Sequence, residues 1–216
     1  TYGRVSMLDY RPYYRRHLPH LQPPGSTLFI TFRLVGSLPR VVIEELMAER
    51  QRVEQKLKQI ADPAEQMQQA YLEGRHLFGR WDTALDTSEG GPRWLADSRI
   101  AGLVAESLHY RHGWVYELHA FCIMPNHVHL VCTPLEKQEG EYHSLTAILH
   151  SLKRYTAREA NKILGRQGEF WQAESYDHVA RDESEFQRII AYVLNNPVKA
   201  GLVSVWEEWP WGYLRA

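Results

Sequence analysis

Two histidines, His127 and His129, flank a single valine within the strand-forming segment 121–132. Successive side chains of a β-strand point to opposite faces, so both imidazoles would lie on one face while Val128 points into a core. Two neutral imidazoles side by side on a rigid strand can bind one divalent metal ion. The same pattern also fits two polar residues on the solvated face of an amphipathic strand, and the pair alone leaves both interpretations open.

A second pair of candidates, Tyr192 and Asn196, lies in a segment with helical spacing. Residues four apart on a helix project from the same side. The Asn196 amide oxygen is a hard ligand that could complete a Mg²⁺ or Mn²⁺ shell beside two imidazoles. The Tyr192 phenol could then attack a phosphate oriented by the metal and become a phosphotyrosine. A half-buried tyrosine in a helix core has the same spacing, and Pro197 disfavours α-helical geometry at Asn196.

Other side chains compete for these roles. Tyr155 and Tyr176 are alternative nucleophiles, but Tyr155 falls on the apolar stripe of its helix, which predicts a buried position, and Tyr176 lies on a strand without an adjacent amide ligand. Glu174 and His178 are possible further metal ligands, although a structural role is the favoured interpretation of His178.

The apolar periodicity predicts a sheet protein with several helices. The predicted strands cover 27–34, 114–124, 127–133 and 175–180, and the predicted helices cover 39–61, 63–78, 93–111, 144–164 and a segment from 182 that ends at Pro197. This order predicts an α+β fold, a ferredoxin-like antiparallel sheet with helices on one face and a helical insertion after the first strand. The histidine strand would lie inside the sheet, where a rigid site is best held. We expect a single domain over 1–216, with a basic N-terminal arm over 1–26 and a helical elaboration over about 41–111.

The composition is that of an ordinary globular protein, with 44% hydrophobic and 24% charged residues among 216. The apolar runs are too short to span a membrane, and the first residues lack a secretory signal pattern, so we expect a cytoplasmic protein. Its two cysteines, Cys122 and Cys132, stand in apolar company and are expected to be buried free thiols.

Charge is unevenly distributed along a chain whose net charge is −1. Residues 1–40 carry six arginines against one aspartate, a net of +5, and residues 151–166 carry five basic residues against one glutamate, a net of +4. Two basic segments fit phosphate contacts on one face of a nucleic-acid-binding protein, although plain solvated helices carry such runs too. The candidate DNA-binding residues are Arg11, Arg15, Arg16, Arg33, Lys153, Arg154, Arg158 and Lys162.

Several short motifs follow one another in a specific order. They are Arg16-His-Leu-Pro-His20, Thr31-Phe-Arg-Leu34, Met124-Pro-Asn-His-Val-His-Leu130, Leu152-Lys-Arg-Tyr155, Phe170-Trp-Gln172, Tyr192-Val-Leu-Asn-Asn-Pro-Val-Lys-Ala-Gly-Leu-Val203 and Trp209-Pro-Trp211. In this order they resemble the REP-associated tyrosine transposases, a branch of the single-tyrosine HUH transposase superfamily. The resemblance covers residues 10–40 and 112–213, whereas residues 41–111 contain no matching motif.

This resemblance implies a ferredoxin-like fold with the histidine pair on a central strand. It implies that Tyr192 attacks single-stranded DNA at hairpin-forming palindromic repeats, forms a 5′-phosphotyrosine and leaves a free 3′-hydroxyl. His127, His129 and Asn196 match the family's ligand positions for Mg²⁺ or Mn²⁺, with asparagine where relatives often have glutamine. The basic arm and the 151–166 helix would contact hairpin DNA, in a monomer acting in cis or in a homodimer.

Three other functions fit the same residues. A catalytically idle regulator derived from such an enzyme would bind hairpin DNA without forming a covalent adduct. A metal-dependent hydrolase with a water nucleophile would keep its activity without the Tyr192 hydroxyl. A structural or partner-binding domain would bind neither metal nor DNA.

Overall fold

The computed structural model describes residues 13–15, 19–21, 24–88 and 90–215, and the chain divides into two compact units. One unit comprises Thr1–Val35 and Arg93–Ala216, and the other comprises Gly36–Pro92. The sequence-based description as a single domain stays a prediction.

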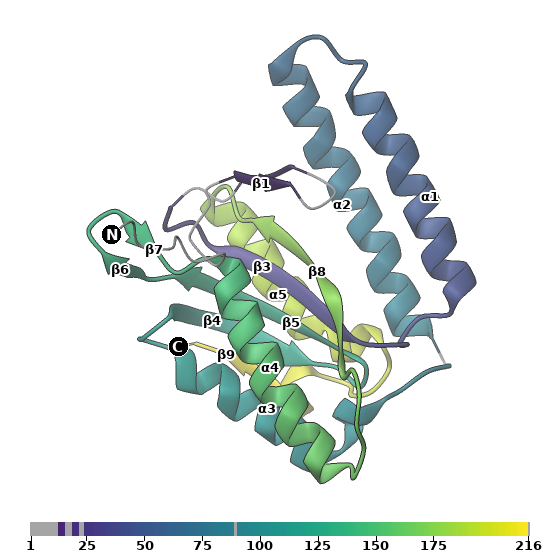
Figure 1. The fold of residues 1–216 in the computed structure, drawn as a ribbon, viewed down its shortest axis with the longest axis vertical. Coiled ribbons are helices and arrows are strands. Elements are labelled where there is room, and N and C mark those ends of the chain that lie inside the picture. The colour runs from purple at the N-terminus through teal and green to yellow at the C-terminus, as the bar shows by residue number, and fades with distance from the viewer. Residues whose placement is uncertain (1–12, 16–18, 22–23, 89, 216) are drawn as a thin grey trace, which may run out of the picture. The chain divides into compact units, whose positions relative to one another are not determined.

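The first unit contains a five-stranded antiparallel sheet with the strand order β8-β3-β5-β4-β9 (Figure 1). The strands are β3 (Leu28–Leu34), β4 (Tyr116–Ile123), β5 (His127–Pro134), β8 (Trp171–Val179) and β9 (Gly212–Leu214). β5 is the central strand and pairs with β3 on one side and β4 on the other. The predicted α+β fold and the interior position of the histidine strand are therefore confirmed.

Helices cover both faces of this sheet. α3 (Ser98–Arg111) and α4 (Leu145–Ile163) pack on the face that carries alternate residues of β3 and β5, including Phe32 and Leu130. α5 (Glu183–Lys199) packs on the opposite face, where the Tyr192 ring contacts Phe29. This arrangement differs from the predicted one, with helices on one face. The reason is that every residue of β3 is buried, so both faces of the strand need a covering layer.

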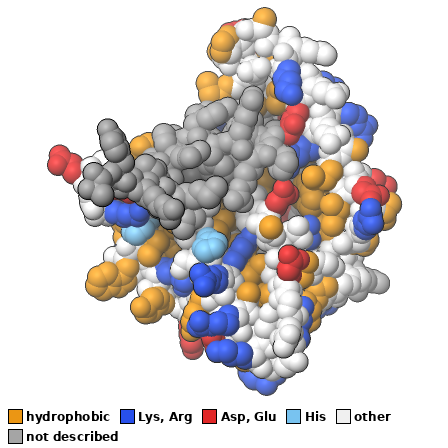
Figure 2. All heavy atoms as spheres, viewed as in Figure 1, with side chains coloured by type: hydrophobic (Ala, Val, Ile, Leu, Met, Phe, Trp, Pro, Cys, Tyr) orange, Lys and Arg blue, Asp and Glu red, His pale blue; other side chains and the backbone are white. Residues whose placement is uncertain are grey.

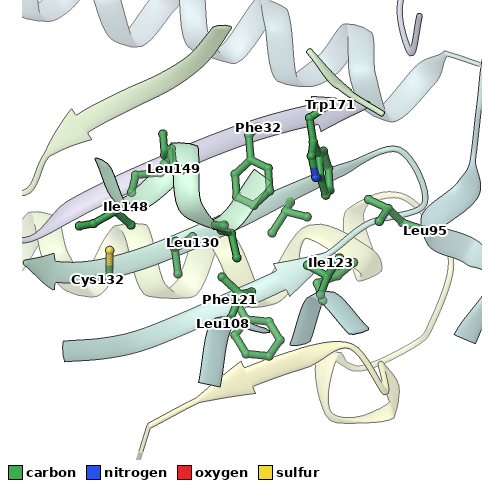
Figure 3. Close-up of a cluster of buried hydrophobic side chains, with 14 of the residues drawn as sticks. Phe32, Leu95, Leu108, Phe121, Ile123, Leu130, Cys132, Ile148, Leu149 and Trp171 are labelled. Carbon is green, nitrogen blue, oxygen red and sulfur yellow. The ribbon is translucent and has the colours of Figure 1, made fainter. Parts of the chain in front are cut away.

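The main hydrophobic core lies between the sheet and the helices α3 and α4 (Figure 3). Phe32 and Trp171 meet there edge to face, with ring centroids 4.9 Å apart. Cys132 belongs to this core, whereas Cys122 is the cross-strand partner of His129. Both are buried free thiols, as the sequence predicted, and burial raises the pKa of the Cys132 thiol.

Side-chain caps define the helices that matter most for the site. The Ser144 hydroxyl accepts a hydrogen bond from Ala147 N at 3.2 Å and starts α4, and Asp182 accepts one from Glu185 N at 2.8 Å and starts α5. The sequence predicted that α5 ends at Pro197, but the helix continues to Lys199. Pro197 has no N–H to bond to the Val193 oxygen and its ring crowds that carbonyl, so it weakens this part of the helix, but α5 still continues for two more residues.

One residue differs from its prediction, and three short strand pairings were not predicted. Tyr155 is 43% exposed rather than buried, because the buried stripe of α4 passes through Thr156, whose hydroxyl accepts a hydrogen bond from Trp171 Nε1 at 2.8 Å. The segment after β5, for which the sequence predicted neither a helix nor a strand, contains the hairpin β6 (Glu136–Gln138) and β7 (Glu141–Tyr142). The aromatic tail adds β9 to the edge of β4. In the N-terminal arm, β1 (Tyr13–Arg15) pairs with β2 (Pro19–Leu21).

The second unit is an antiparallel helical hairpin of α1 (Arg40–Leu57) and α2 (Pro63–Thr87). Val53 and Leu57 of α1 pack against Leu77 of α2, and Glu49 forms an ion pair with Arg80. Asp62 caps α2 by accepting hydrogen bonds from two backbone N–H groups. α2 is longer than the predicted 63–78 segment. Within the described ranges, none of the helices has the length and apolar character that crossing a bilayer requires.

Candidate functional site

His127 and His129 are fully buried and lie on the α5 side of β5. Their Nε2 atoms are 3.0 Å apart, and the two rings meet at an interplanar angle of 75°. Val128, between them, belongs to the core on the other face. The alternation expected of a strand is therefore present, and both imidazoles direct a nitrogen to the same point. The interpretation as two polar residues on a solvated face is wrong, because neither ring is exposed.

The outer nitrogen of each imidazole has its own buried partner. His127 Nδ1 lies 2.7 Å from Asn126 Oδ1, and His129 Nδ1 lies 2.8 Å from Thr31 Oγ1. A metal-binding histidine typically hydrogen-bonds through its second nitrogen in this way, because that bond fixes the ring orientation. The histidine pair therefore has the surroundings of a pair of metal ligands.

Asn196 is the least satisfied polar residue on α5. Its side chain is 1% exposed, and neither Oδ1 nor Nδ2 has a hydrogen-bond partner within the described part of the chain. A buried polar group without a partner costs about 1–3 kcal/mol, so such a group in a folded protein calls for a ligand or another explanation. The amide oxygen is available to coordinate a cation, and it comes one helical turn after Tyr192 on the same helix.

Tyr192 connects α5 to the histidine pair. Its ring centroid is 5.8 Å from that of His129 and 6.0 Å from that of Phe29, both in edge-type geometry. The Lys199 ammonium lies 5.8 Å from the centre of the same ring. The Tyr192 side chain is half-buried, so packing holds its ring while part of the side chain stays accessible to solvent. The fold thus brings together His129 and Tyr192, which are far apart in the sequence.

Arg33 lies on β3 in register with His127 and is only 8% exposed. Burial lowers the pKa of its guanidinium, and the nearby Glu174 carboxylate partly offsets that shift. An arginine remains charged in proteins despite such shifts. A buried positive charge therefore stands beside the histidine pair, where a phosphate group could bind.

The basic residues of α4 lie on the opposite face of the sheet from the histidines, and Figure 2 shows Lys and Arg side chains gathered over this helix. Lys153 is a structural residue in this arrangement, since its Nζ donates to the backbone oxygen of Gln172 at 2.8 Å and to Ser175 Oγ at 2.7 Å. Arg158 and Lys162 both donate hydrogen bonds to Glu159, whose negative charge weakens their attraction for a phosphate. Arg154 is exposed to solvent.

Some of the N-terminal basic candidates lie outside the described residues. Arg15 ends β1, and Arg11 and Arg16 lie outside the described residues. Among the basic candidates whose side chains are described, Arg33 is the one on the histidine face.

The competing residues have other environments. His178 Nε2 lies 3.0 Å from Glu185 Oε1, and the second oxygen of that carboxylate accepts a hydrogen bond from Arg181 N. This arrangement ties β8 to the start of α5 and fits the structural interpretation. Tyr155 lies on α4, away from the histidines, and Tyr176 packs against Phe29 with ring centroids 6.2 Å apart.

Sequence reasoning did not single out Thr31 and Asn126. Both stand inside quoted motifs, and Asn126 directly precedes the first histidine. Thr31 could have been found by aligning the two predicted strands, because it is the cross-strand partner of His129.

Comparisons with known proteins show similarity to transposases. Residues 104–196 match the sequence model of the family described as "Transposase IS200 like", and this range contains both histidines, Tyr192 and Asn196. Two similar proteins come from Haemophilus influenzae. One is named "Putative REP-associated tyrosine transposase" and is 28% identical over 101 residues, which cover 44% of this chain and 57% of that protein. The other, of uncharacterized function, is 27% identical over 108 residues, which cover 41% of this chain and 54% of that protein.

The matches span little more than half the length of these two curated relatives. A solved structure described as a REP-associated tyrosine transposase bound to a REP hairpin aligns with a TM-score of 0.51 at 16% identity. The alignment covers 92% of this chain and 80% of that chain. At this identity the likeness shows the fold.

Replacing Asn196 by leucine should leave the metal-free protein at least as stable as the wild type, because the change removes two buried polar atoms without partners. We expect the free energy of unfolding, measured by urea titration in EDTA, to rise by about 1 kcal/mol. Asn195→Leu is the control, since that side chain is exposed and donates to Ala191 O at 2.8 Å; its effect should stay below about 0.5 kcal/mol. A loss of more than about 1 kcal/mol in Asn196→Leu would contradict the assignment of its amide as unpartnered.

Proposed function

We propose that this chain, whose residues 104–196 match the model of the IS200-like transposase family, cleaves and rejoins single-stranded DNA with Tyr192 as the nucleophile. The observation that carries the proposal is the contact between the Tyr192 ring and the ring of His129, whose Nε2 converges with that of His127. A nucleophile and a pair of potential metal ligands thus meet on one face of the sheet.

His127, His129 and Asn196 would hold a divalent cation. The 3.0 Å separation of the Nε2 atoms puts both nitrogens within reach of one ion, and the hard amide oxygen of Asn196 would suit Mg²⁺ or Mn²⁺. Such an ion would polarise the scissile phosphate and neutralise the charge that develops on its oxygens.

Tyr192 carries out the bond exchange in this proposal. Its hydroxyl oxygen forms a bond to phosphorus as the bond from phosphorus to the 3′-oxygen breaks. The phenolic proton is lost, and the departing 3′-oxygen takes up a proton to become a free hydroxyl. The DNA 5′-phosphate stays on the tyrosine, and attack by another 3′-hydroxyl reverses these steps and transfers the strand.

Two cations of the chain support the same step. Arg33 is buried beside His127, and the Lys199 ammonium lies over the Tyr192 ring. A phenol has a pKa of about 10 in water and gains from positive charge nearby when it attacks an anionic phosphate. We assign Arg33 to binding the scissile phosphate.

The DNA partner is proposed to be a hairpin formed by a palindromic repeat, in line with the relative whose structure contains a REP hairpin. The exposed Arg154 and the basic N-terminal arm would contribute phosphate contacts, which are salt-dependent and carry no sequence information by themselves. The protein would act as a monomer in cis or as a homodimer.

Incubating the protein with single-stranded hairpin DNA and Mn²⁺ should produce a covalent protein–DNA band on a denaturing gel. Tyr192→Phe should abolish the band, because it removes the attacking oxygen and keeps the ring. Tyr176→Phe is the matched control, since it removes a hydroxyl from the other tyrosine that packs on Phe29. Strand cleavage that survives in Tyr192→Phe would indicate a water nucleophile, and DNA binding without any band in the wild type would indicate an idle regulator.

Changing both His127 and His129 to alanine should remove cleavage while hairpin affinity stays within about threefold of wild type, because the proposal gives the imidazoles a role in metal binding. Gel shift and cleavage assays on the same DNA check this. If hairpin affinity falls together with cleavage, the histidines contact DNA or maintain the fold.

A further inference from the structure

The two imidazoles of the histidine pair have chemically different outer partners. His127 Nδ1 faces the amide oxygen of Asn126 at 2.7 Å, and His129 Nδ1 faces the hydroxyl of Thr31 at 2.8 Å. All four residues are buried, so water cannot replace these bonds readily. An amide oxygen can only accept a hydrogen bond, whereas a hydroxyl can donate or accept.

Asn126 restricts His127 to one tautomer. Because its Oδ1 accepts, His127 must carry a hydrogen on Nδ1, and its Nε2 then presents a lone pair. Asn126 is held in place by its own backbone, whose oxygen accepts a hydrogen bond from Leu34 N at 2.9 Å. His127 is therefore ready to bind a cation without any rearrangement.

His129 faces a conflict that His127 does not. Its Nε2 lies 3.0 Å from the His127 lone pair, and two lone pairs at that distance would repel each other. The repulsion is absent in the metal-free protein if His129 carries its hydrogen on Nε2 and donates it to His127. His129 Nδ1 then has a lone pair and accepts a hydrogen bond from the Thr31 hydroxyl.

Cation binding requires lone pairs on both Nε2 atoms, so His129 must change tautomer. Solvent water takes the proton from Nε2 as the cation binds and supplies another at Nδ1, so the imidazole stays neutral and no net proton is released. The Thr31 O–H bond stays intact, but the hydroxyl rotates and accepts from Nδ1–H. The outer hydrogen bond of His129 is thus kept in both states with its direction reversed.

We propose that Thr31 is a positioning residue: its hydroxyl reverses the direction of its hydrogen bond and so lets His129 change tautomer when a divalent cation binds. Asn126 keeps His127 in one tautomer throughout. This inference rests on the proposed metal-binding function of the pair. The β3–β5 pairing makes it possible, because Thr31 is the direct cross-strand partner of His129. Threonine also suits a strand position better than a longer polar side chain.

Nitrogen-15 NMR of the full chain with labelled histidine tests the tautomers directly, since protonated and unprotonated imidazole nitrogens have distinct chemical shifts. His127→Gln and His129→Gln spectra provide the assignments. We expect His127 as Nδ1–H with and without Mg²⁺, and His129 as Nε2–H without Mg²⁺ and Nδ1–H at saturating Mg²⁺. A His129 that is already Nδ1–H without Mg²⁺, or that stays Nε2–H at saturation, overturns the proposal.

Mn²⁺ titrations of the DNA-free protein by calorimetry supply an independent measurement. Thr31→Val keeps the shape of the side chain but removes the hydroxyl, and it should weaken Mn²⁺ binding by about 10- to 100-fold, the usual effect of losing an outer partner. Thr31→Ser should stay within about threefold of wild type. Thr27→Val is the matched control, because it removes a hydroxyl that pairs with Thr133 Oγ1 at 2.8 Å, just before the same strand; its affinity should match the wild type.

The outcomes separate this inference from the proposed function. If Thr31→Val binds Mn²⁺ like the wild type while His129→Ala does not, the role of Thr31 is overturned and the metal site stands. If the wild type binds no more tightly than His129→Ala, both the metal site and the role of Thr31 are overturned. A loss in Thr31→Val that is not restored in Thr31→Ser also contradicts a role for the hydroxyl.

Discussion

The site depends on one constraint, the burial of two imidazoles on the same face of a central strand with their Nε2 atoms 3.0 Å apart. β5 is paired on both edges, so its neighbours fix its register. A shift of one residue would turn both histidines into the apolar core and Val128 toward α5. The stability of the sheet and the geometry of the site are therefore maintained by the same strand pairings.

One face of the sheet forms the hydrophobic core, and the other face carries the site. The face covered by α3 and α4 is an apolar core that includes Phe32, Leu130 and Trp171. The face covered by α5 carries the histidines, Thr31 and Arg33, all buried, together with the aromatic ring of Phe29. Buried polar groups cost stability unless they are satisfied, so the apolar face must supply the free energy that the polar face does not. α5 then adds Tyr192 and Asn196 without disturbing that core.

Local sequence patterns were sufficient to predict the strand and the helix that carry the site residues, but not how these elements pack together. A period of two identified the common face of His127 and His129, and a period of 3.6 identified the helix of Tyr192 and Asn196. The face on which α5 packs depends on how the chain connects, and no local pattern reports it. Thr31 was missed because its partner is 98 residues away, and only the strand register brings them together. The sequence analysis assigned Tyr155 to the buried stripe of α4 in place of Thr156. A threonine is a polar residue, and its burial here depends on the hydrogen bond that it accepts from Trp171.

Anomalous diffraction from crystals of the protein grown with Mn²⁺ would test the central claim most directly, because it locates the ion without relying on activity. The account predicts one peak about 2.0–2.2 Å from Nε2 of both His127 and His129, with the Asn196 amide oxygen as a third ligand and Tyr192 beside it. A peak elsewhere on the chain, or no peak at the histidines at a Mn²⁺ concentration that supports DNA cleavage, would contradict it.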